Sequence, residues 1–298
     1  MKLNSDADAF TPPFEVIAQG YDFIEAPRVT TQGDLWFSDL TGRGVYRVRP
    51  RHASQIMLPD RQWVGGMVFD RSGQVLCSGR GGIVALNPES GSAHDVLTEI
   101  EGTSLGAVND MEGDGKGGFF AGTIDFVAIF ETGQPPAPGM FFHMSAHGAV
   151  TVLRRDVIAS NGIAASPCGK WLYHVETGRG VWRYPMENGL PAAGEIVIVL
   201  DDGDGLAVDT AGNLWVACWN TARLLQVSPE GACMQVMTFP YPHIVSIVFG
   251  ADDPSRLYVA TGGNAAQPHT GAVLRLKMEI PGLPGPMTRL KALEGDRA

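Results

Sequence analysis

A three-strand pattern that recurs along the chain is the feature that most limits what it can fold into. Residues 203–231 contain a short apolar run, a turn at Gly212, a second run that alternates at period two, and a third run that ends in Pro-Glu-Gly. Three short strands joined by tight turns predict a small antiparallel sheet. One such sheet cannot bury its own apolar faces, so neighbouring copies must stack against each other.

Six copies of this pattern account for most of the 298 residues. The glycines of the turn before the second run follow one another at intervals of 40 to 52 residues, and they are Gly33, Gly73, Gly117, Gly169 and Gly212. This period, with one small sheet in each unit, is typical of a β-propeller. We therefore predict an all-β fold, a six-bladed β-propeller that forms a single domain over residues 1–298.

The copies also predict where each blade lies. We expect the blades at about residues 25–50, 65–91, 109–150, 161–189, 204–231 and 244–277. Segments from both ends of the chain fall outside these copies, and one of them is expected to supply the outer strand that closes the ring. Our prediction for that strand is the sequence FEVI at residues 14–17.

Charge and apolar content exclude several classes of function. The net charge of -10 argues against nucleic acid and anionic membranes as partners, because both would be repelled. No apolar run reaches the roughly 18 residues that a transmembrane helix needs. The four cysteines have no C-x-x-C spacing, which favours reduced structural thiols. We expect a cytoplasmic monomer or homodimer that acts on a small molecule.

One position of the repeated pattern carries an oxygen-bearing side chain in four of the five copies that have one of these turn glycines. The residues eight positions before the turn glycines are Glu25, Gly65, Asn109, Asn161 and Asp204. In a propeller the innermost strand of each blade lines the central channel, so equivalent positions at its start form a ring at one mouth. Two carboxylates and two carboxamides are therefore expected to converge on the axis.

Such a set of oxygen atoms suits a divalent cation. Carboxylate and amide oxygens are the ligands that Ca²⁺, Mg²⁺ and Mn²⁺ prefer. The alternative is that Asn-Gly, Asp-Gly and Asn-Asp are only turn dipeptides at strand entrances. Four such residues in register, with Glu25 not a turn former, favour the metal site. We predict one divalent ion, Ca²⁺ before Zn²⁺, Mg²⁺ or Mn²⁺, bound by Glu25, Asn109, Asn161 and Asp204.

The same residues carry a family resemblance. Glu25-Ala-Pro, Asn109-Asp, Ser160-Asn-Gly and Gly203-Asp-Gly, each with the run that follows it, resemble the SMP-30/gluconolactonase/luciferin-regenerating-enzyme family over nearly the whole chain. The resemblance implies a six-bladed propeller that holds one divalent metal through Glu25, Asn161 and Asp204. It also implies that Asn109 lies near both metal and substrate. Many members of the family hydrolyse lactones.

A metal at the channel mouth indicates a hydrolytic mechanism. A bound cation can polarise an ester carbonyl and stabilise the oxyanion that forms when water attacks. We expect Asp204 to act as the general base, because a carboxylate beside the metal can reach such a water. His243, at the entrance to the sixth copy, is a second candidate acid, base or hydrogen-bond donor. Its alternative is a packing role.

The substrate is expected to be apolar or aromatic rather than a sugar lactone. Sugar-lactone members of the family carry an arginine two residues before the metal-proximal asparagine, where this chain has Ala107. Four aromatic residues near the expected mouth loops are candidates for substrate binding, with core packing as the alternative for each. They are Trp63, Phe126, Trp219 and Tyr241.

Two other functions remain open at this level. The first keeps the metal and changes the reaction, as a lyase, an isomerase or an ether-cleaving enzyme on an aromatic compound. The second is a non-catalytic binding propeller whose metal is structural. Fold alone does not decide between them, because one fold supports many chemistries.

Overall fold

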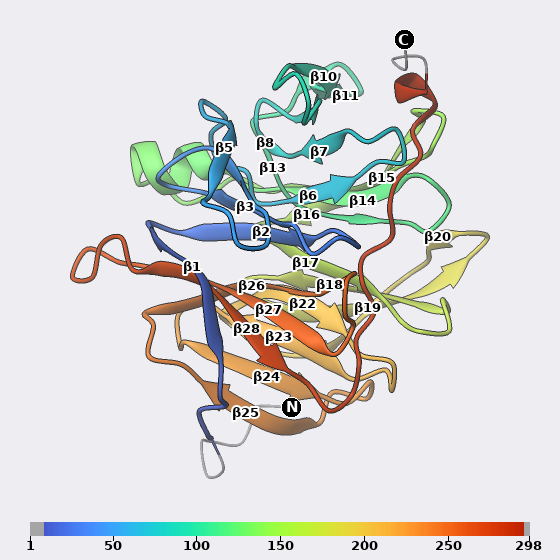
Figure 1. The fold of residues 1–298 in the computed structure, drawn as a ribbon. Coiled ribbons are helices and arrows are strands. Elements are labelled where there is room, and N and C mark those ends of the chain that lie inside the picture. The colour runs from blue at the N-terminus through green and yellow to red at the C-terminus, as the bar shows by residue number, and fades with distance from the viewer. Residues whose placement is uncertain (1–8, 295–298) are drawn as a thin grey trace.

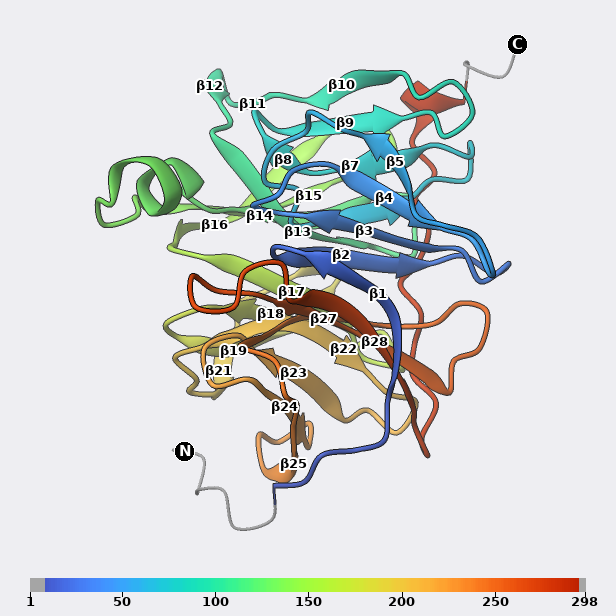
Figure 2. The same ribbon diagram turned by 60° about the vertical axis from the view of Figure 1, so that its left-hand side comes forward.

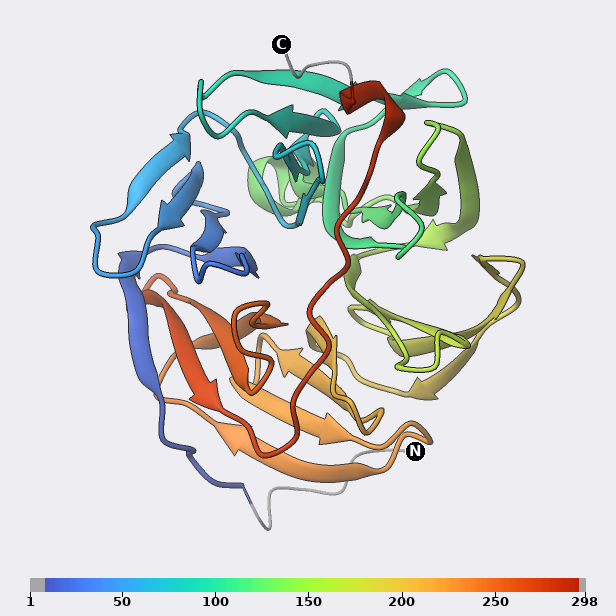
Figure 3. The same ribbon diagram turned by 45° about the vertical axis from the view of Figure 1, so that its right-hand side comes forward.

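Six antiparallel sheets surround a central axis, and together they form the predicted six-bladed propeller. The structure is a computed structural model that describes residues 9–294; residues 1–8 and 295–298 of the expected domain lie outside this range. Figures 1 and 2 show the sheets edge-on, and Figure 3 looks closer to the axis. The chain visits the blades in sequence order, so each repeat of the sequence supplies one blade.

The first three blades follow one another from residue 24. Blade 1 contains β2 (Ile24–Val29), β3 (Leu35–Asp39), β4 (Val45–Val48) and β5 (Gln55–Leu58). Blade 2 contains β6 (Met67–Phe69), β7 (Val75–Cys77), β9 (Ile83–Leu86) and β10 (Ala93–Leu97). Blade 3 contains β13 (Ala107–Gly113), β14 (Phe119–Thr123), β15 (Gly139–Met144) and β16 (Val150–Val157), with β8 (Gly79–Arg80) added beside β13. A hairpin of β11 (Glu99–Ile100) and β12 (Thr103–Ser104) connects blades 2 and 3.

The remaining blades complete the ring. Blade 4 contains β17 (Ser160–Ala165), β18 (Trp171–Glu176) and β19 (Gly180–Glu187), with β20 (Leu190–Pro191) and β21 (Glu195–Ile198) both paired to β19. Blade 5 contains β22 (Gly203–Val208), β23 (Leu214–Cys218), β24 (Arg223–Val227) and β25 (Cys233–Thr238). Blade 6 contains β26 (His243–Phe249), β27 (Arg256–Gly262), β28 (Gly271–Lys277) and β1 (Glu15–Tyr21).

Blade 6 is closed by a strand from the other end of the chain. β1 pairs antiparallel with β28, and the pairing begins with Glu15 opposite Arg275. An ion pair of 2.5 Å joins the Arg275 guanidinium to the Glu15 carboxylate. The strand includes residues 15–17 of the FEVI segment singled out in the sequence, so residues from both ends of the propeller share one sheet.

The core lies between adjacent blades rather than within one sheet. Trp36 and Val45 of blade 1 pack with Met67 and Val75 of blade 2 in one buried cluster. The innermost strand β2 is buried along its whole length, whereas the outer strand β5 is largely exposed. Burial therefore decreases from the axis outward, and each blade depends on its neighbours for a core.

The turn glycines adopt the backbone that the repeat requires. In blade 5, the amide of Gly212 donates to the carbonyl of Asp209 over 2.9 Å, and Gly212 has a φ of +91°. The Asp209 carboxylate accepts bonds from the amides of Ala211 and Asn213. A positive φ is accessible to glycine without a steric cost, which explains the recurrence of glycine at this position.

Two irregular segments lie on opposite faces of the ring (Figures 1 and 2). One is the loop between β14 and β15, which contains the π-helix η1 (Ala128–Thr132). The other is the C-terminal segment, which crosses the centre of the ring in Figure 3 and ends in the 3-10 helix η2 (Lys291–Leu293). The two faces of the ring therefore carry different irregular parts of the chain.

Candidate functional site

Four inner strands carry the oxygen-bearing residues of the predicted ring, and each strand is bulged at that point. The pairing of β2 with β3 is irregular between Glu25 and Arg28, and that of β22 with β23 is irregular between Gly203 and Leu206. Similar irregularities flank Asn109 in β13 and Asn161 in β17. A bulge interrupts the regular alternation of side chains and re-aims one of them. The bulges therefore mark the positions where the candidate ligands depart from regular strand geometry.

These four side chains line one cavity of about 330 Å³. Glu25, Asn109, Asn161 and Asp204 come from blades 1, 3, 4 and 5 and are all buried. The fifth ring position, Gly65 of blade 2, has no side chain, and a Cβ atom there would collide with the Asn109 Oδ1 atom. The glycine thus leaves space for Asn109.

Hydrogen bonds between blades hold the two asparagines. Asn109 Nδ2 donates to the Ser160 carbonyl and to Asn161 Oδ1, each over 2.7 Å. Asn161 Nδ2 donates to Thr177 Oγ1 over 2.7 Å, and Thr177 donates in turn to the Gly203 carbonyl. This chain of bonds joins blades 3, 4 and 5 at the axis and limits rotation of both carboxamides.

The two carboxylates lie in an electrostatic setting that disfavours their ionised form. Burial, followed by the nearby charges of Asp204 and Asp110, raises the pKa of Glu25 well above its usual range. Burial, followed by the charges of Asp110 and Asp202, likewise raises the pKa of Asp204 well above its usual range. Among the described residues that line this cavity, none is a lysine or an arginine. The two carboxylates of the cavity therefore have no positively charged side chain beside them in its lining, and a bound cation would stabilise their ionised form.

The donor set fits a hard divalent cation. Two carboxylates and two carboxamides supply only oxygen atoms toward a metal, as such ions prefer. The buried Asn109 Oδ1 atom has no hydrogen-bond partner in the described structure. No cluster of three or more His, Cys, Asp or Glu side chains suited to a metal occurs within residues 9–294. A site of this kind therefore depends on its carboxamides as well as its carboxylates.

Apolar side chains form the rest of the cavity wall. Besides the four oxygen-bearing residues, the cavity is lined by Phe23, Leu40, Thr41, Ile124, Phe126, Ile129, Phe130, Ala159, Thr177 and Trp219. Two of the four predicted substrate-binding aromatics, Phe126 and Trp219, are among them. The cavity thus has polar groups at the channel axis and a mostly apolar wall around them.

The other aromatic residues singled out in the sequence lie elsewhere. Trp63 is buried behind the wall, where its ring centroid lies 5.7 Å from that of Phe126. Tyr241 lines a separate cavity with Pro240 and Asn264, and its ring packs against Phe14. Neither lines the cavity that holds the candidate ligands. Trp63 packs against Phe126, which lines that cavity, whereas the contacts of Tyr241 described here do not reach a residue of its lining.

His243 lies behind two wall residues. Its Nδ1 atom donates to the Trp219 carbonyl over 2.8 Å, since a carbonyl can only accept. Its ring centroid lies 5.5 Å from that of Trp219 and 5.6 Å from that of Phe23. These contacts suit a residue that orients the wall, and His243 is not among the residues that line the cavity.

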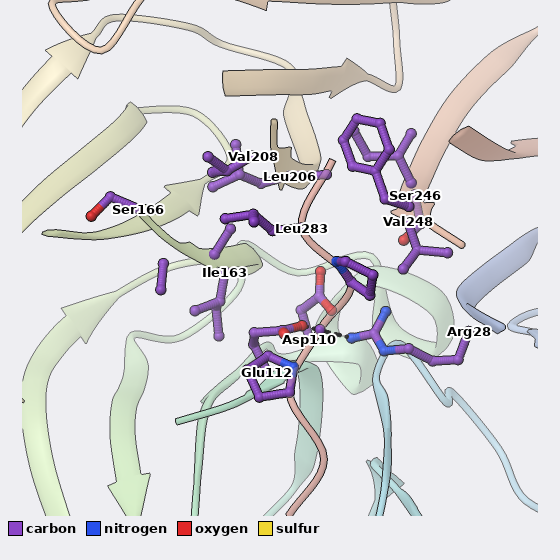
Figure 4. Close-up of a pocket in the computed structure, with 18 residues that line it drawn as sticks. Arg28, Asp110, Glu112, Ile163, Ser166, Leu206, Val208, Ser246, Val248 and Leu283 are labelled. Carbon is purple, nitrogen blue, oxygen red and sulfur yellow. Dashed lines mark hydrogen bonds and ion pairs between the residues drawn. The ribbon is translucent and has the colours of Figure 1, made fainter. Parts of the chain in front are cut away.

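A second cavity, of about 250 Å³, lies farther along the inner strands and is shown in Figure 4. Arg28 bonds there to the Met111 carbonyl over 2.7 Å and to Glu112 over 3.2 Å. Burial raises the pKa of Asp110 to about 6 and that of Glu112 to about 7, although Arg28 lowers both. Residues 283–286 of the C-terminal segment line this cavity as well.

Several of these residues were not predicted from the sequence. Ile129 and Phe130 lie in the long loop of blade 3, where two large apolar residues between turn-forming residues are an available signal. Asp110 and Glu112 follow Asn109 on the same strand at a spacing of two residues, but Arg28 and residues 283–286, which complete the cavity, come from distant parts of the chain. Sequence spacing alone therefore could not find the second cavity.

Fold and cavity together describe a propeller with a cavity lined in part by oxygen-bearing side chains of four inner strands. Residues 23–263 match the model of the SMP-30/Gluconolactonase/LRE-like region, so the chain belongs to this family. The resemblance seen in the motifs is thereby confirmed. Because the match spans five complete blades and part of the sixth, it concerns nearly the whole ring.

Similar proteins include enzymes and calcium-binding proteins by name. The 6-deoxy-6-sulfogluconolactonase of Pseudomonas putida is 27% identical over 269 residues, which cover 85% of this chain and 90% of that protein. Regucalcin of Xenopus laevis is 27% identical over 280 residues, which cover 88% and 92%. The crystal structure of a calcium-binding protein, regucalcin, from Agrobacterium tumefaciens superposes with a TM-score of 0.83 at 21% identity, covering 96% of this chain and 100% of that one. This last likeness concerns the fold.

No helix among the described residues is both long and apolar enough to cross a membrane.

Proposed function

We propose that this protein is a divalent-metal-dependent hydrolase that opens a lactone. The observation that carries the proposal is the cavity in which two buried carboxylates and two carboxamides from four blades meet without a cationic side chain. The names of relatives in the family, among them a sulfogluconolactonase, support a lactone as the substrate class. The name regucalcin and the description of a calcium-binding structure support Ca²⁺ before Mg²⁺, Mn²⁺ or Zn²⁺.

Each candidate residue has a defined role in this proposal. Glu25, Asn161 and Asp204 would hold the cation, and Asn109 would lie beside it and contact the substrate. A bound cation would polarise the lactone carbonyl and stabilise the charge that develops on its oxygen. We assign Asp204 the role of accepting the proton of the attacking water at a carboxylate oxygen, because a carboxylate beside the metal would reach such a water.

The wall residues orient the substrate. Phe126 and Trp219 line the cavity and contact the apolar part of the reactant. His243 fixes Trp219 through the bond to its carbonyl oxygen, and a direct catalytic role for His243 remains a prediction. Trp63 supports Phe126 from behind. Tyr241 is proposed only as a more distant substrate contact, because it borders a different cavity.

The wall favours an apolar or aromatic lactone over a sugar lactone. Of the residues that line the cavity, only Thr41, Thr177 and the indole of Trp219 add hydrogen-bond donors to those of the asparagines. Thr177 already donates to the Gly203 carbonyl. Each buried hydroxyl left without a partner costs about 1–3 kcal/mol, so a polyhydroxylated ring would bind poorly. Ala107 supplies no donor at the position where sugar-lactone members carry arginine.

A metal-replacement assay with the Asp204→Asn variant tests this function. Protein treated with a chelator should open no lactone, and Ca²⁺ should restore turnover, with Mg²⁺, Mn²⁺ and Zn²⁺ compared alongside. In Asp204→Asn we expect kcat/KM to fall by about 100-fold or more. The metal-free melting temperature should not fall, because the amide removes a buried charge that Asp110 and Asp202 oppose.

Asp95→Asn is the matched control, since Asp95 lies exposed on the outer strand β10. Unchanged turnover in Asp204→Asn would refute the general-base assignment. If no lactone is consumed with any of the four ions while a metal still raises the melting temperature, a binding propeller is the better account. Products from aromatic ethers instead of lactones would identify the lyase or ether-cleaving alternative.

A further inference from the structure

The connection between β14 and β15 differs from its counterparts in other blades. It spans residues 124–138, whereas the same connection takes residues 40–44 in blade 1 and residues 219–222 in blade 5. It contains the π-helix η1, which projects from the face of the ring opposite the C-terminal segment (Figure 2). Four of its residues, Ile124, Phe126, Ile129 and Phe130, line the cavity that holds the candidate ligands.

Side-chain contacts hold this segment against Trp63, in the loop between β5 and β6, and against Arg80 of β8. The ring of Phe126 lies 5.7 Å from that of Trp63 and 5.3 Å from that of Phe130, measured between centroids. Arg80 stacks on the ring of Trp63, with its guanidinium carbon 4.6 Å from the ring centroid. The same guanidinium forms an ion pair of 2.7 Å with Glu131 of the segment. These contacts give the segment a defined position beside the cavity.

Two of its apolar residues are unusually accessible for residues that line a cavity. Ile129 is 42% exposed and Phe130 is 45% exposed. Further apolar side chains, Phe23, Leu40 and Trp219, line the same cavity. A ligand seated among these side chains would remove their apolar surface from water, and that removal is favourable.

The size of the cavity limits what the walls can enclose. A volume of about 330 Å³ lies at the lower end of the range usual for small-molecule sites. A five- or six-membered lactone with a short apolar substituent is a ligand of suitable size. The oxygen-bearing residues at the axis suit the ring ester, and the segment supplies an apolar surface for the remainder.

We propose that residues 124–138 determine substrate specificity, and that Ile129 and Phe130 bind an alkyl or aryl substituent on the lactone ring. This inference rests on the proposed lactone-opening function and adds to it the substrate class and the segment that selects it. The docked position of η1 makes the apolar surface part of the site before substrate arrives. Binding therefore does not have to order the segment first.

A chain-length series of γ-alkyl lactones, from methyl to pentyl, tests the proposal in the calcium-loaded protein. We expect kcat/KM to rise by about fourfold for each methylene group that the walls enclose. In Phe130→Ala and Ile129→Ala this rise per methylene should become smaller, and in Phe130→Leu it should largely persist. Ile196→Ala is the matched control, because Ile196 is 40% exposed on the outer strand β21. Equal dependence on chain length in Phe130→Ala and the unaltered protein would overturn the proposal.

A binding arm separates this inference from the function on which it rests. The affinities of the γ-alkyl lactams, which keep the ring and resist hydrolysis, are measured by isothermal titration calorimetry. If no lactone is consumed, the proposed function fails, yet lactam affinity that grows with chain length and falls in Phe130→Ala still supports the specificity segment. Lactam affinity that does not depend on chain length overturns it, whatever the turnover.

Discussion

At the scale of single residues, the site depends on which residue stands at each of the five ring positions and on the lack of a side chain at one of them. Glu25, Asn109, Asn161 and Asp204 carry oxygen atoms and line one cavity, and Gly65 contributes no side chain. The absence of a side chain at Gly65 is itself structural, because the space that a Cβ would fill is taken by the Asn109 carboxamide. The fifth position thus shapes the site without a functional group.

This dependence predicts a specific effect of adding one methyl group. Gly65→Ala should displace the Asn109 side chain and weaken its bonds to Ser160 and Asn161. We expect kcat/KM for the best lactone to fall by about tenfold or more, because small misplacements in a site are costly to catalysis. The control is Gly106→Ala, where a Cβ would meet no atom within 4 Å. Equal kinetics in the two variants would contradict the role given to Gly65.

At the scale of elements, the inner strands and the helix η1 contribute different parts of the site. The inner strands are buried and bulged, and they set the oxygen atoms in place. The helix η1 is held in part by the exposed Arg80–Glu131 pair and the stacking of Arg80 on Trp63, and such ion pairs and cation–π contacts each stabilise by about 1 kcal/mol or less. We therefore expect the strands to be rigid and the helix to open locally at modest cost.

Removing the Arg80 side chain should loosen the helix. Arg80→Ala deletes the stacking on Trp63, the ion pair with Glu131 and a bond to Gln62 Oε1. Backbone amides of residues 127–133 should exchange with deuterium several-fold faster, while the melting temperature changes by about 2 °C or less. Hydrogen-exchange mass spectrometry measures the first quantity and calorimetry the second. Unaltered exchange in the segment would show that the apolar contacts of Phe126 suffice.

At the scale of the whole molecule, the ring is tied together by both ends of the chain. β1 completes blade 6, and the C-terminal segment joins opposite sides of the ring. On one side Leu283 donates to the Val208 carbonyl over 2.9 Å, and on the other the Leu290 amide donates to Asp70 over 2.9 Å. A ring of stacked blades gains from such cross-links, because each blade lacks a core of its own.

The C-terminal segment therefore contributes to global stability through its buried residues. Leu290 is 1% exposed in the core cluster of blades 2 and 3, so Leu290→Ala should lower the free energy of unfolding by about 2–4 kcal/mol. Met287 of the same segment is 45% exposed, and Met287→Ala should change it by about 0.5 kcal/mol or less. Urea denaturation compares the two. Similar losses in both variants would contradict an anchor at Leu290.

Four outer strands were not predicted by the repeat pattern. The predicted blade ranges covered the apolar inner runs, but β5, β10, β21 and β25 begin after the ranges of their blades end. Most residues of these strands are exposed or half-buried, and they follow no strong apolar alternation, as in the exposed first half of β10. They form because an edge of the sheet is available for pairing, which local sequence does not reveal.

The sequence by itself determined the six-fold repeat, the family, and the four oxygen-bearing residues at equivalent positions, because a repeated local pattern places equivalent residues at equivalent points of a ring. Only the tertiary structure decided which aromatic residues reach the cavity. It put Phe126 and Trp219 on the wall, Trp63 behind it and Tyr241 at another cavity. Bulges and a long insertion break the local period, so the final direction of a side chain depends on contacts between blades that lie far apart in sequence.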